Sequence, residues 1–338
     1  MNSRTPGVHP THYATYFDRH YLTRGLALLR SLEQHCAPFV LWVLCLDAET
    51  EELLRRLDSQ HVRRVPLAEL EQADPALLAV KPNRQPVEYF WTCGPALLVH
   101  VLRRDPTIET LAYLDADMFF FDAPAPIFAG LRDRSIVLME QRYVQAKGGR
   151  FNVGMLAFRR TPSALACLNR WREQCLEWCY DRFEPGRHGD QKYLEEWPDR
   201  YDVTILEYAG AGVAPWNVET QRIHYRGGRV LVEGDPLVVY HFARIHLIHR
   251  WIYELHDYRW QDRKMDPLVR RWIYAPYIRE LYAAEGRVRQ LGGRVYKGTA
   301  RQPDSPGEAV RRKRAQAVPW TRLAQYQRFM FVAGRWTW

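Results

Sequence analysis

The sequence predicts an α/β fold with a mixed, mostly parallel sheet flanked by helices. Strand-like and helix-like segments alternate over residues 1–120, as expected for strands joined by crossover helices. The run FVLWVLCLD (39–47) is apolar throughout, which is typical of a central parallel strand covered on both faces. Another apolar run, LAYL (111–114), ends in Asp115-Ala116-Asp117. Such sheets bind ligands beyond the carboxyl ends of their strands, so we expect a ligand site here.

The elements of the first half follow from the spacing of apolar residues. Leu26, Leu29 and Leu32 share one face of an amphipathic helix predicted over 22–35. A second helix is predicted over 91–104, and Pro95 suits its first turn because proline lacks an amide hydrogen. The other elements predicted here are strands at 13–18, 39–47, 61–67 and 111–114, and a helix that begins at 49–52.

The second half is less regular and ends in a biased tail. Tryptophans and tyrosines among charges predict two amphipathic helices within 251–284. The other predicted elements are strands at 135–144, 151–160, 203–208 and 237–242, and a helix at 162–181. We therefore expect a catalytic α/β domain at 1–250, a helical extension at 251–285 and a basic tail at 286–338. Gly, Pro, Gln and Arg dominate that tail, which predicts partial disorder up to about Arg314.

Composition indicates a cytoplasmic enzyme. The hydrophobic fraction of 47% and charged fraction of 26% are ordinary for a soluble protein. The sequence shows neither a secretory signal nor an apolar run of transmembrane length. Its six cysteines include no Cys-x-x-Cys pair and are predicted to be buried free thiols. Cys175 and Cys179, four residues apart, could alternatively form half of a metal site.

The tail carries the excess positive charge. Residues 286–338 hold twelve lysines and arginines against two acidic residues, whereas the whole chain has a net charge of +9. Basic and aromatic residues together favour peripheral contact with the anionic inner face of a membrane. A solvated tail, or one that contacts another subunit, is the alternative. No groove-reading element is visible, so nucleic acid is not an expected partner.

Asp115 and Asp117 are the strongest candidate site residues. Two carboxylates at positions i and i+2 can converge on one hard divalent cation, which commonly keeps positions open for phosphates. Carboxylates are costly to place at the end of an apolar strand unless they are paired or bound to metal. A solvated turn is the alternative interpretation.

Seven segments in order carry a resemblance to the GT-A glycosyltransferases, specifically to nucleotide-diphospho-sugar transferases related to the glycogenin-like family 8 enzymes. They span roughly residues 12–245 and read YATYFDRHYLTRGLALLRSL, EYFWTCGPALL, YLDADMFFFD, FNVGMLAFRR, HGDQKYL, APWNV and VVYHF. The resemblance implies a GT-A fold and a hexosyltransferase that uses a nucleotide diphosphate sugar, with UDP-sugar favoured. It also implies Mn²⁺ or Mg²⁺ as cofactor, and a glycan, lipid-linked or protein hydroxyl as acceptor.

The resemblance also implies roles for individual residues. Asp115, Asp117 and His241 would bind the metal, and Asp115 the donor diphosphate as well. Asp190 and Gln191 would lie across the site as catalytic residues. The segments imply nucleobase contacts for Ala14, Thr15 and Tyr16, and sugar contacts for Asn152 and Gly154. The chain departs from the family after His-Phe, where it reads ARIHLIHRW and lacks the lysine expected at the diphosphate; Arg244 or Arg250 are candidate replacements.

Several of these residues have structural alternatives. His241 could be an ordinary buried histidine, or form a zinc cluster with His246 and His249. Asp190 could cap the helix that follows it. Asp18 and Glu88 are weaker candidates for the site, with the same two interpretations as Asp190.

Two further pairs are binding candidates by their context. Trp216 and Asn217 could form a stacking and hydrogen-bonding wall for a sugar, or be structural. Lys81 and Arg84 lie on a proline-flanked loop suited to phosphate, and a solvated loop is the alternative.

The mechanism expected from the resemblance is sugar transfer with retention, by attack on the same face as the departing phosphate. Inversion with Asp190 as general base stays open. One rival is a sugar nucleotidyltransferase, but its first strand should lead into a Gly-rich basic loop, and the chain has Asp18-Arg19-His20-Tyr21 there. The other rival is a non-catalytic nucleotide-sugar-binding protein.

Overall fold

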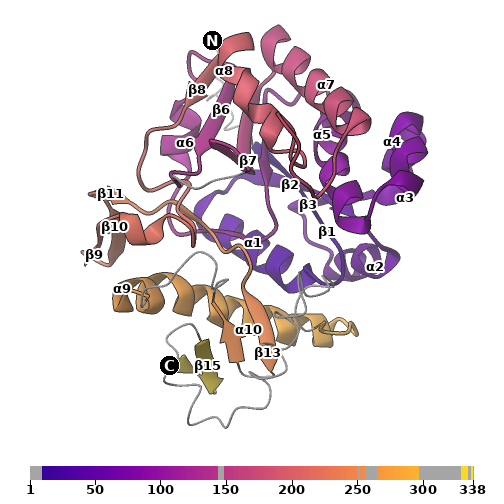
Figure 1. Cartoon of the computed structure of the whole chain (residues 1–338). Helices are drawn as coiled ribbons and strands as arrows, with labels where there is room; N and C mark the ends of the chain where they lie inside the picture. Colours follow the sequence, from indigo (N-terminus) through magenta and orange to yellow (C-terminus); the bar gives the residue numbers. More distant parts are fainter. Residues whose placement is uncertain are drawn as a thin grey trace, which may run out of the picture.

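The computed structural model describes residues 10–143, 148–249, 252–255, 265–296, 329–333 and 336–337. Its centre is a seven-stranded sheet in the order β3-β2-β1-β4-β7-β6-β8 (Figure 1). These strands are β1 Thr11–Phe17, β2 Phe39–Cys45, β3 Val62–Pro66, β4 Thr110–Leu114, β6 Ile136–Glu140, β7 Phe151–Arg159 and β8 Val203–Ile205. Only β7 runs antiparallel to its neighbours β4 and β6, and the other pairs are parallel. The predicted mixed, mostly parallel sheet is confirmed.

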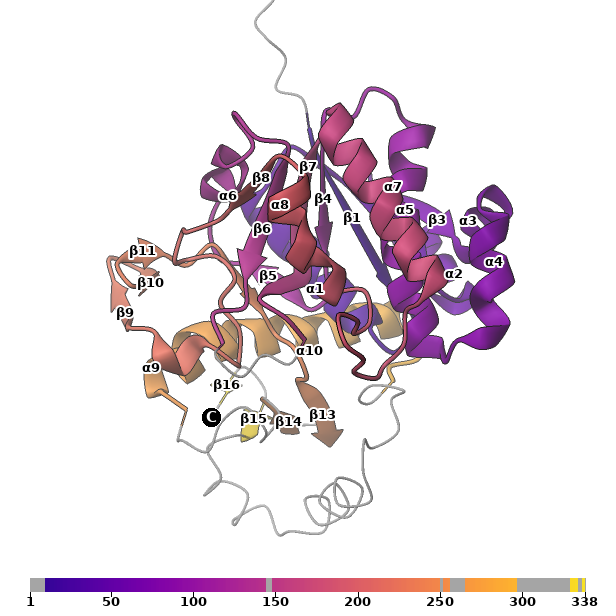
Figure 2. The ribbon, with the colours of Figure 1, turned by 45° about the horizontal axis from the view of Figure 1, so that its top comes forward.

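Helices cover both faces of the sheet (Figure 2). On one face lie α5 (Pro86–Arg104) and α7 (Pro162–Glu177), packed on side chains such as Ala14 of β1. On the other face lie α1 (Leu22–His35), α2 (Ala48–Leu57) and α6 (Ala125–Ala129), packed on the alternate side chains, such as Tyr13. Burial on both faces explains why β2 is apolar at every position.

Most predicted elements are found, and α5 is the main correction among the helices. The helix predicted at 22–35 is confirmed at both ends as α1. By contrast, α5 begins at Pro86, so Pro95 lies inside the helix and not in its first turn. The start is fixed by Pro86 at the first helical position and by Glu88, whose carboxylate accepts a hydrogen bond from the Gln85 amide at 2.7 Å. Glu88 is therefore a capping residue.

The region 251–284 was predicted to form two helices, and this is wrong at its start. Ile252–Glu254 is strand β14, paired with β13 (His246–His249) and with β15 (Phe329–Ala333), which also pairs with β16 (Trp336–Thr337). A strand of three residues is too short for periodicity to distinguish it from part of a helix, which explains the error. Helical structure follows in α9 (Pro267–Val269), a π-helical turn (Arg270–Tyr274) and α10 (Ala275–Gln290).

Short elements escaped prediction because they carry too few residues for a periodic pattern. One of them, β5 (Met118–Phe120), pairs beside the main sheet with β12 (Val239–His241), which lies within the strand predicted at 237–242. The others are α3 Leu67–Ala73, α4 Pro75–Val80, α8 Trp197–Arg200, β9 Ile223–Arg226, β10 Arg229–Val232, β11 Asp235–Pro236, and 3-10 turns at Lys81–Asn83, Lys192–Glu196 and Val218–Thr220.

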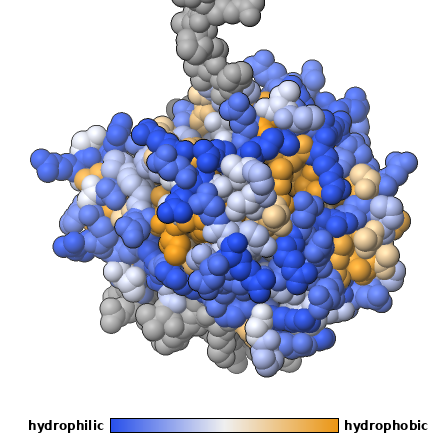
Figure 3. Space-filling view, turned by 90° about the horizontal axis from the view of Figure 1, so that it is seen from above, coloured by the Kyte–Doolittle hydropathy of each residue, from blue (hydrophilic) through white to orange (hydrophobic). Residues whose placement is uncertain are grey.

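Two expectations from composition can be compared with the structure. All six cysteines are buried and free, as predicted. Burial raises the pKa of the Cys175 thiol, which disfavours the thiolate that a metal half-site with Cys179 would need. No helix in the described part of the chain combines the length and apolar character needed to cross a bilayer. The face seen in Figure 3 is largely hydrophilic, with hydrophobic residues in a few separate patches.

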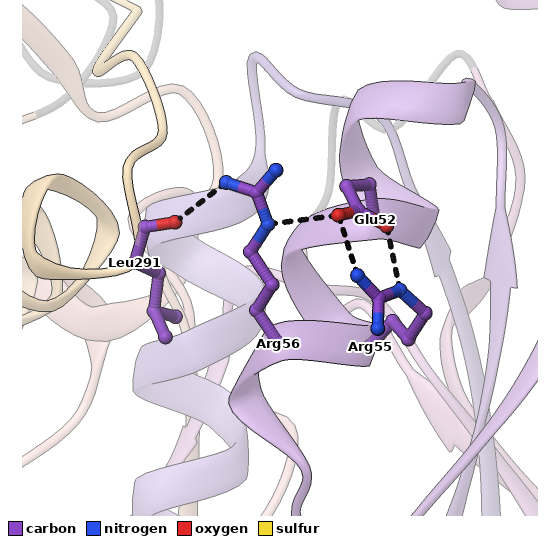
Figure 4. Close-up of polar contacts among 4 residues, drawn as sticks. All are labelled: Glu52, Arg55, Arg56 and Leu291. Atoms are coloured by element: carbon purple, nitrogen blue, oxygen red, sulfur yellow. Dashed lines mark hydrogen bonds and ion pairs between the residues drawn. The ribbon is translucent and has the colours of Figure 1, made fainter.

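Helix α10 is joined to the α/β body near its carboxyl end (Figure 4). Arg56 donates from Nη1 to the Leu291 carbonyl at 2.9 Å and from Nε to the Glu52 carboxylate at 2.8 Å. The same carboxylate accepts two hydrogen bonds from Arg55, and these arginine contacts lower the pKa of Glu52 to about 2. The last carbonyls of a helix have no partner within the helix, and Arg56 is the hydrogen-bond donor for the Leu291 carbonyl here. Helix α10 ends at Gln290, beyond the boundary predicted at 285; the division into domains stays a prediction.

Candidate functional site

Asp115 and Asp117 lie in the tight turn that joins β4 to β5. The Asp115 amide donates to the Gly154 carbonyl at 2.8 Å, which ties the turn to β7. The Met118 amide then donates to the Asp115 carbonyl at 3.0 Å and closes the turn. Both carboxylates are thus placed at the carboxyl end of the central parallel strand, as the sequence predicts.

His241 reaches the same place from β12. This strand pairs antiparallel with β5, and His241 lies opposite Met118. Its Nε2 is 3.1 Å from Asp117 Oδ1 and 3.5 Å from Asp115 Oδ2. One ligand atom from each of the three residues lies within 4.8 Å of the others. The structure therefore brings together the three predicted metal ligands. In the described part of the chain, no other cluster of three or more such side chains has this spacing.

The surroundings hold these three side chains in place. The Tyr113 hydroxyl donates to Asp115 Oδ1 at 2.7 Å, and the Trp216 ring packs edge-on against His241 with centroids 5.3 Å apart. Gly154 leaves room for the imidazole, because a Cβ at this position would lie 2.8 Å from two atoms of the His241 ring. Two carboxylates and an imidazole, oriented by neighbours in this way, fit a divalent cation such as Mn²⁺ or Mg²⁺.

The three side chains of this cluster shift one another's pKa values. Burial raises the pKa of Asp117, but the charge and hydrogen bond of His241 outweigh it and leave the pKa lowered. Burial lowers the pKa of His241, and the charge and hydrogen bond of Asp117 raise it above its usual value. The pKa of Asp115 is raised, mainly by burial. Without a cation, Asp117 and His241 thus stabilise each other's charged forms.

A cavity of about 160 Å³ opens beside Asp115. Tyr16, Gly154, Asp190 and Gln191 line it, so these predicted residues meet in one place. The other lining residues are Trp91, Val153, His188 and Gly189. Of these, Trp91 and His188 were missed. Both lie in segments that carry the family resemblance: Trp91 in EYFWTCGPALL and His188 at the start of HGDQKYL.

Asp190 faces this cavity from a buried position. Burial, followed by the negative charge of Asp115, raises the pKa of Asp190 to about 8. Its main-chain carbonyl accepts a hydrogen bond from Trp171 Nε1 at 2.9 Å. The following 3-10 turn has Gln191 as its N-cap, without a side-chain capping bond, so Asp190 is not the helix cap considered as the alternative.

Asn152 and Gln191 form a network that fixes the cavity wall. Asn152 donates to Gln191 Oε1 at 3.2 Å and accepts from the Gly154 amide at 2.9 Å. Gln191 also accepts from the Val153 amide at 3.3 Å and donates to the Gly148 carbonyl at 3.2 Å. The side chains of Asn152 and Gln191 therefore fix β7 and the loop before it relative to each other at the site.

Other predicted residues lie away from the cavity. The side chains of Ala14 and Thr15 are fully buried in β1, and only Tyr16 of that trio lines the cavity. Asn217 is fully buried, where it donates to the Gln141 and Gly212 carbonyls and accepts from the Ala214 amide. These contacts make Asn217 a loop-shaping residue.

The loop with Lys81 and Arg84 also lies outside the cavity lining. Lys81 forms an ion pair with Glu71 at 2.6 Å. Arg84 donates to the Leu176 carbonyl at 3.1 Å and covers the Tyr180 ring at 4.1 Å. Both cations therefore have protein partners. Of the residues proposed to replace the missing lysine, Arg244 has a left-handed backbone with φ of 61° and Arg250 is outside the described residues, as are the side chains of His246 and His249.

Comparison with solved structures identifies the fold. The galactosyltransferase LgtC, solved in complex with donor and acceptor sugar analogs, matches with a TM-score of 0.52. The match covers 81% of this chain and 96% of LgtC at 14% sequence identity. The chain thus has the GT-A glycosyltransferase fold, as the resemblance implied. No protein-family model matches the sequence.

Two relatives are similar in sequence over most of the chain. The uncharacterized protein YfnD of Bacillus subtilis (strain 168) is 36% identical over 279 residues, which cover 80% of this chain and 88% of YfnD. The uncharacterized protein YfnF of the same organism is 31% identical over 288 residues, which cover 80% of this chain and 89% of YfnF. Identity at this level over nearly the full length of both relatives places the chain in the same family as YfnD and YfnF.

Proposed function

We propose that this protein is a metal-dependent glycosyltransferase that moves a hexosyl group from a nucleotide diphosphate sugar, with UDP-sugar favoured, to a hydroxyl acceptor. The observation that supports it best is the convergence of Asp115, Asp117 and His241 at the carboxyl end of β4 on a GT-A fold. A cavity lined by Asp190 and Gln191 adjoins this cluster and offers space for the sugar.

Asp115, Asp117 and His241 would hold Mn²⁺ or Mg²⁺, which when bound neutralises negative charge on the diphosphate leaving group. Tyr113 orients Asp115 through its hydroxyl hydrogen bond, and Gly154 keeps the space that the His241 ring needs. Asn152 and Gln191 fix the adjoining wall of the cavity. Tyr16 lines the same cavity and is the candidate contact for the nucleotide part of the donor.

We propose retention of anomeric configuration. An inverting enzyme needs a general base that is ionised near neutral pH. The pKa of Asp190, raised to about 8 by burial and by Asp115, keeps this carboxyl largely protonated there in the metal-free protein. In that state Asp190 can donate a hydrogen bond to a sugar hydroxyl, which fits a binding role, and the family resemblance supports retention.

The acceptor is proposed to be a hydroxyl of a glycan, a lipid-linked sugar or a protein, in the cytoplasm. The basic tail is proposed to bring the enzyme to the inner face of the membrane, although most of it lies outside the described residues. Because β15 near the carboxyl end pairs with β14, charge removal tests this better than truncation. Replacement of Arg311, Arg312, Lys313 and Arg314 by glutamine should reduce binding to anionic lipid vesicles, and equal binding would reject membrane contact.

The test of the function is a panel of UDP- and GDP-sugars, with release of nucleoside diphosphate measured with and without Mn²⁺. The parent protein should release nucleoside diphosphate only with metal, and Asp117→Ala should abolish this release with little change in melting temperature. Equal release by Asp117→Ala would reject the metal assignment. Titration calorimetry with UDP and Mn²⁺ tests the first alternative function, because binding without release indicates a binding protein. A separate assay with UTP and a sugar phosphate tests the second, because formation of pyrophosphate indicates a nucleotidyltransferase.

A further inference from the structure

An exposed aromatic side chain lies next to the cavity of the proposed active site. Phe183 is 57% exposed, the most exposed large hydrophobic side chain in the described part of the chain. Its ring stacks on His188 with centroids 3.9 Å apart and planes 14° apart. His188 lines the cavity together with Asp190. The stacked pair therefore extends the cavity wall outward to the surface.

The loop that presents Phe183 is held rigidly. The amide of Glu184 donates to the Arg187 carbonyl at 3.0 Å, and the Arg187 amide donates back to the Glu184 carbonyl at 3.0 Å. Gly189 has a left-handed backbone with φ of 53°, and a Cβ there would lie 3.2 Å from the Trp91 ring. The ring is thus fixed at the rim of a polar cavity, where it can contact a ligand that also enters the cavity.

The charges on this loop are already compensated. Arg182 pairs with Glu184 at 2.7 Å, and Arg187 pairs with Glu177 at 2.8 Å. The guanidinium of Arg182 also covers the Tyr180 ring at 4.5 Å. The loop therefore offers an apolar ring without a free charge among these residues, which suits an uncharged ligand better than an acidic one.

We propose that Phe183 and His188 form the acceptor platform, on which the C–H face of an uncharged pyranose residue stacks while one of its hydroxyls enters the cavity toward Asp190. The proposal rests on the proposed function and narrows its acceptor to a neutral glycan, as opposed to a serine or threonine hydroxyl of a protein. Ring stacking supplies affinity and orientation, and the hydroxyl group that enters the cavity reaches the donor.

The test measures acceptor binding by saturation-transfer NMR on protein loaded with UDP and Mg²⁺. The probes are the methyl β-glycosides of glucose, galactose and xylose, with methyl glucuronide and N-acetylserine amide as the acidic and acyclic comparisons. We expect saturation of ring C–H protons of at least one neutral glycoside. Phe183→Ala should weaken its binding about fivefold to tenfold, in line with the energy of an aromatic stacking contact. Phe183→Trp should keep the binding.

Leu78→Ala is the matched control, because Leu78 is a large apolar side chain with 47% exposure on α4. This variant should bind the glycoside as the parent does. Equal binding by Phe183→Ala and Leu78→Ala, preference for the glucuronide or the serine derivative, or no transfer to any glycoside would each overturn the platform. Release of nucleoside diphosphate by the parent protein reports separately on the proposed function, so the two failures can be told apart.

Discussion

His241 Nε2 lies 3.1 Å from Asp117 Oδ1, and this contact joins β12 to the turn between β4 and β5, which is far away in the sequence. The Phe242 amide donates to the Asp117 carbonyl at 2.9 Å, so the main chains are fixed together as well as the side chains. His241 Nδ1 is buried without a hydrogen-bond partner, which leaves the ring oriented by packing against Trp216 and by the acidic pair. The candidate metal site thus depends on a long-range strand pairing.

Tyr113→Phe should weaken Mn²⁺ binding without loss of the fold. The substitution removes only the hydroxyl that donates to Asp115 at 2.7 Å, and the ring stays buried against Tyr16. Removal of such an orienting partner typically costs about 10–100-fold in metal affinity. Calorimetric titration with Mn²⁺ measures the change. Tyr89→Phe is the control, because Tyr89 donates to Glu71 on the same side of the sheet and outside the cavity lining. Equal affinities for the two variants would contradict the role of Tyr113.

Gly154→Ala should disturb the site by steric conflict. Its Cβ would lie 2.6 Å from Asn152 Oδ1 and 2.8 Å from His241, closer than real contacts allow. We expect a loss of about 1–3 kcal/mol in the free energy of unfolding, together with weaker Mn²⁺ binding because the imidazole must move.

Gly94→Ala is the control, and it should change the free energy of unfolding in the opposite direction. Gly94 lies inside α5, and its added Cβ would meet only a Tyr16 ring atom at 3.6 Å, an ordinary contact. Alanine is favoured over glycine in helices by about 1 kcal/mol, so this variant should be more stable than the parent. Urea unfolding measures both free energies. A Gly154→Ala protein as stable as Gly94→Ala would show that the space beside His241 is not needed.

The features predicted correctly from the sequence are those that depend on local residue patterns. The spacing of leucines predicted both ends of α1, because a helix that is buried along one side has apolar residues at helical spacing. The apolar runs predicted the parallel strands, because a strand that is buried on both faces is apolar at consecutive positions. The Asp-x-Asp turn was recognisable as acidic residues at the end of an apolar strand. Its meeting with His241 was not, since the pairing of β5 with β12 involves three residues on each side and no periodic signal. Resemblance to a family supplied that residue.

Asp190→Asn should make the metal-free protein more stable, by an amount that grows with pH. The folded protein keeps a proton on Asp190 up to about pH 8, whereas an ordinary aspartate has a pKa of 3.8. Between these values the folded state binds more protons than the unfolded state, so the stability of the parent falls as pH rises. Asparagine does not titrate. The difference in unfolding free energy should therefore increase from pH 4 to pH 8, to the order of a few kcal/mol, and then level off.

Asp105→Asn is the control for this pH series. A hydrogen bond from the Thr107 hydroxyl lowers the pKa of Asp105, so its contribution is complete above the ordinary value and is lost only as pH falls below it. Its difference from the parent should change much less than that of Asp190→Asn between pH 5 and pH 8, because only the minor charge interaction of Asp105 with His12 titrates in this range. Thermal or urea unfolding in buffers that contain a chelator measures both series. A flat difference for Asp190→Asn would show that this carboxyl is ionised in the folded protein.

Arg56→Ala should loosen the carboxyl end of α10 without changing the rest of the fold. Arg56 donates to the Leu291 carbonyl, whereas Arg55 contacts the same Glu52 carboxylate but not α10 (Figure 4). Arg55→Ala is thus a matched control that removes an equal charge from the same helix turn. Hydrogen–deuterium exchange over residues 285–293 should be faster in Arg56→Ala and unchanged in Arg55→Ala, because a helix end without its partner frays more often. Similar exchange in both variants would mean that the packing of Val288 against the body, and not the hydrogen bond from Arg56, anchors this end of the helix.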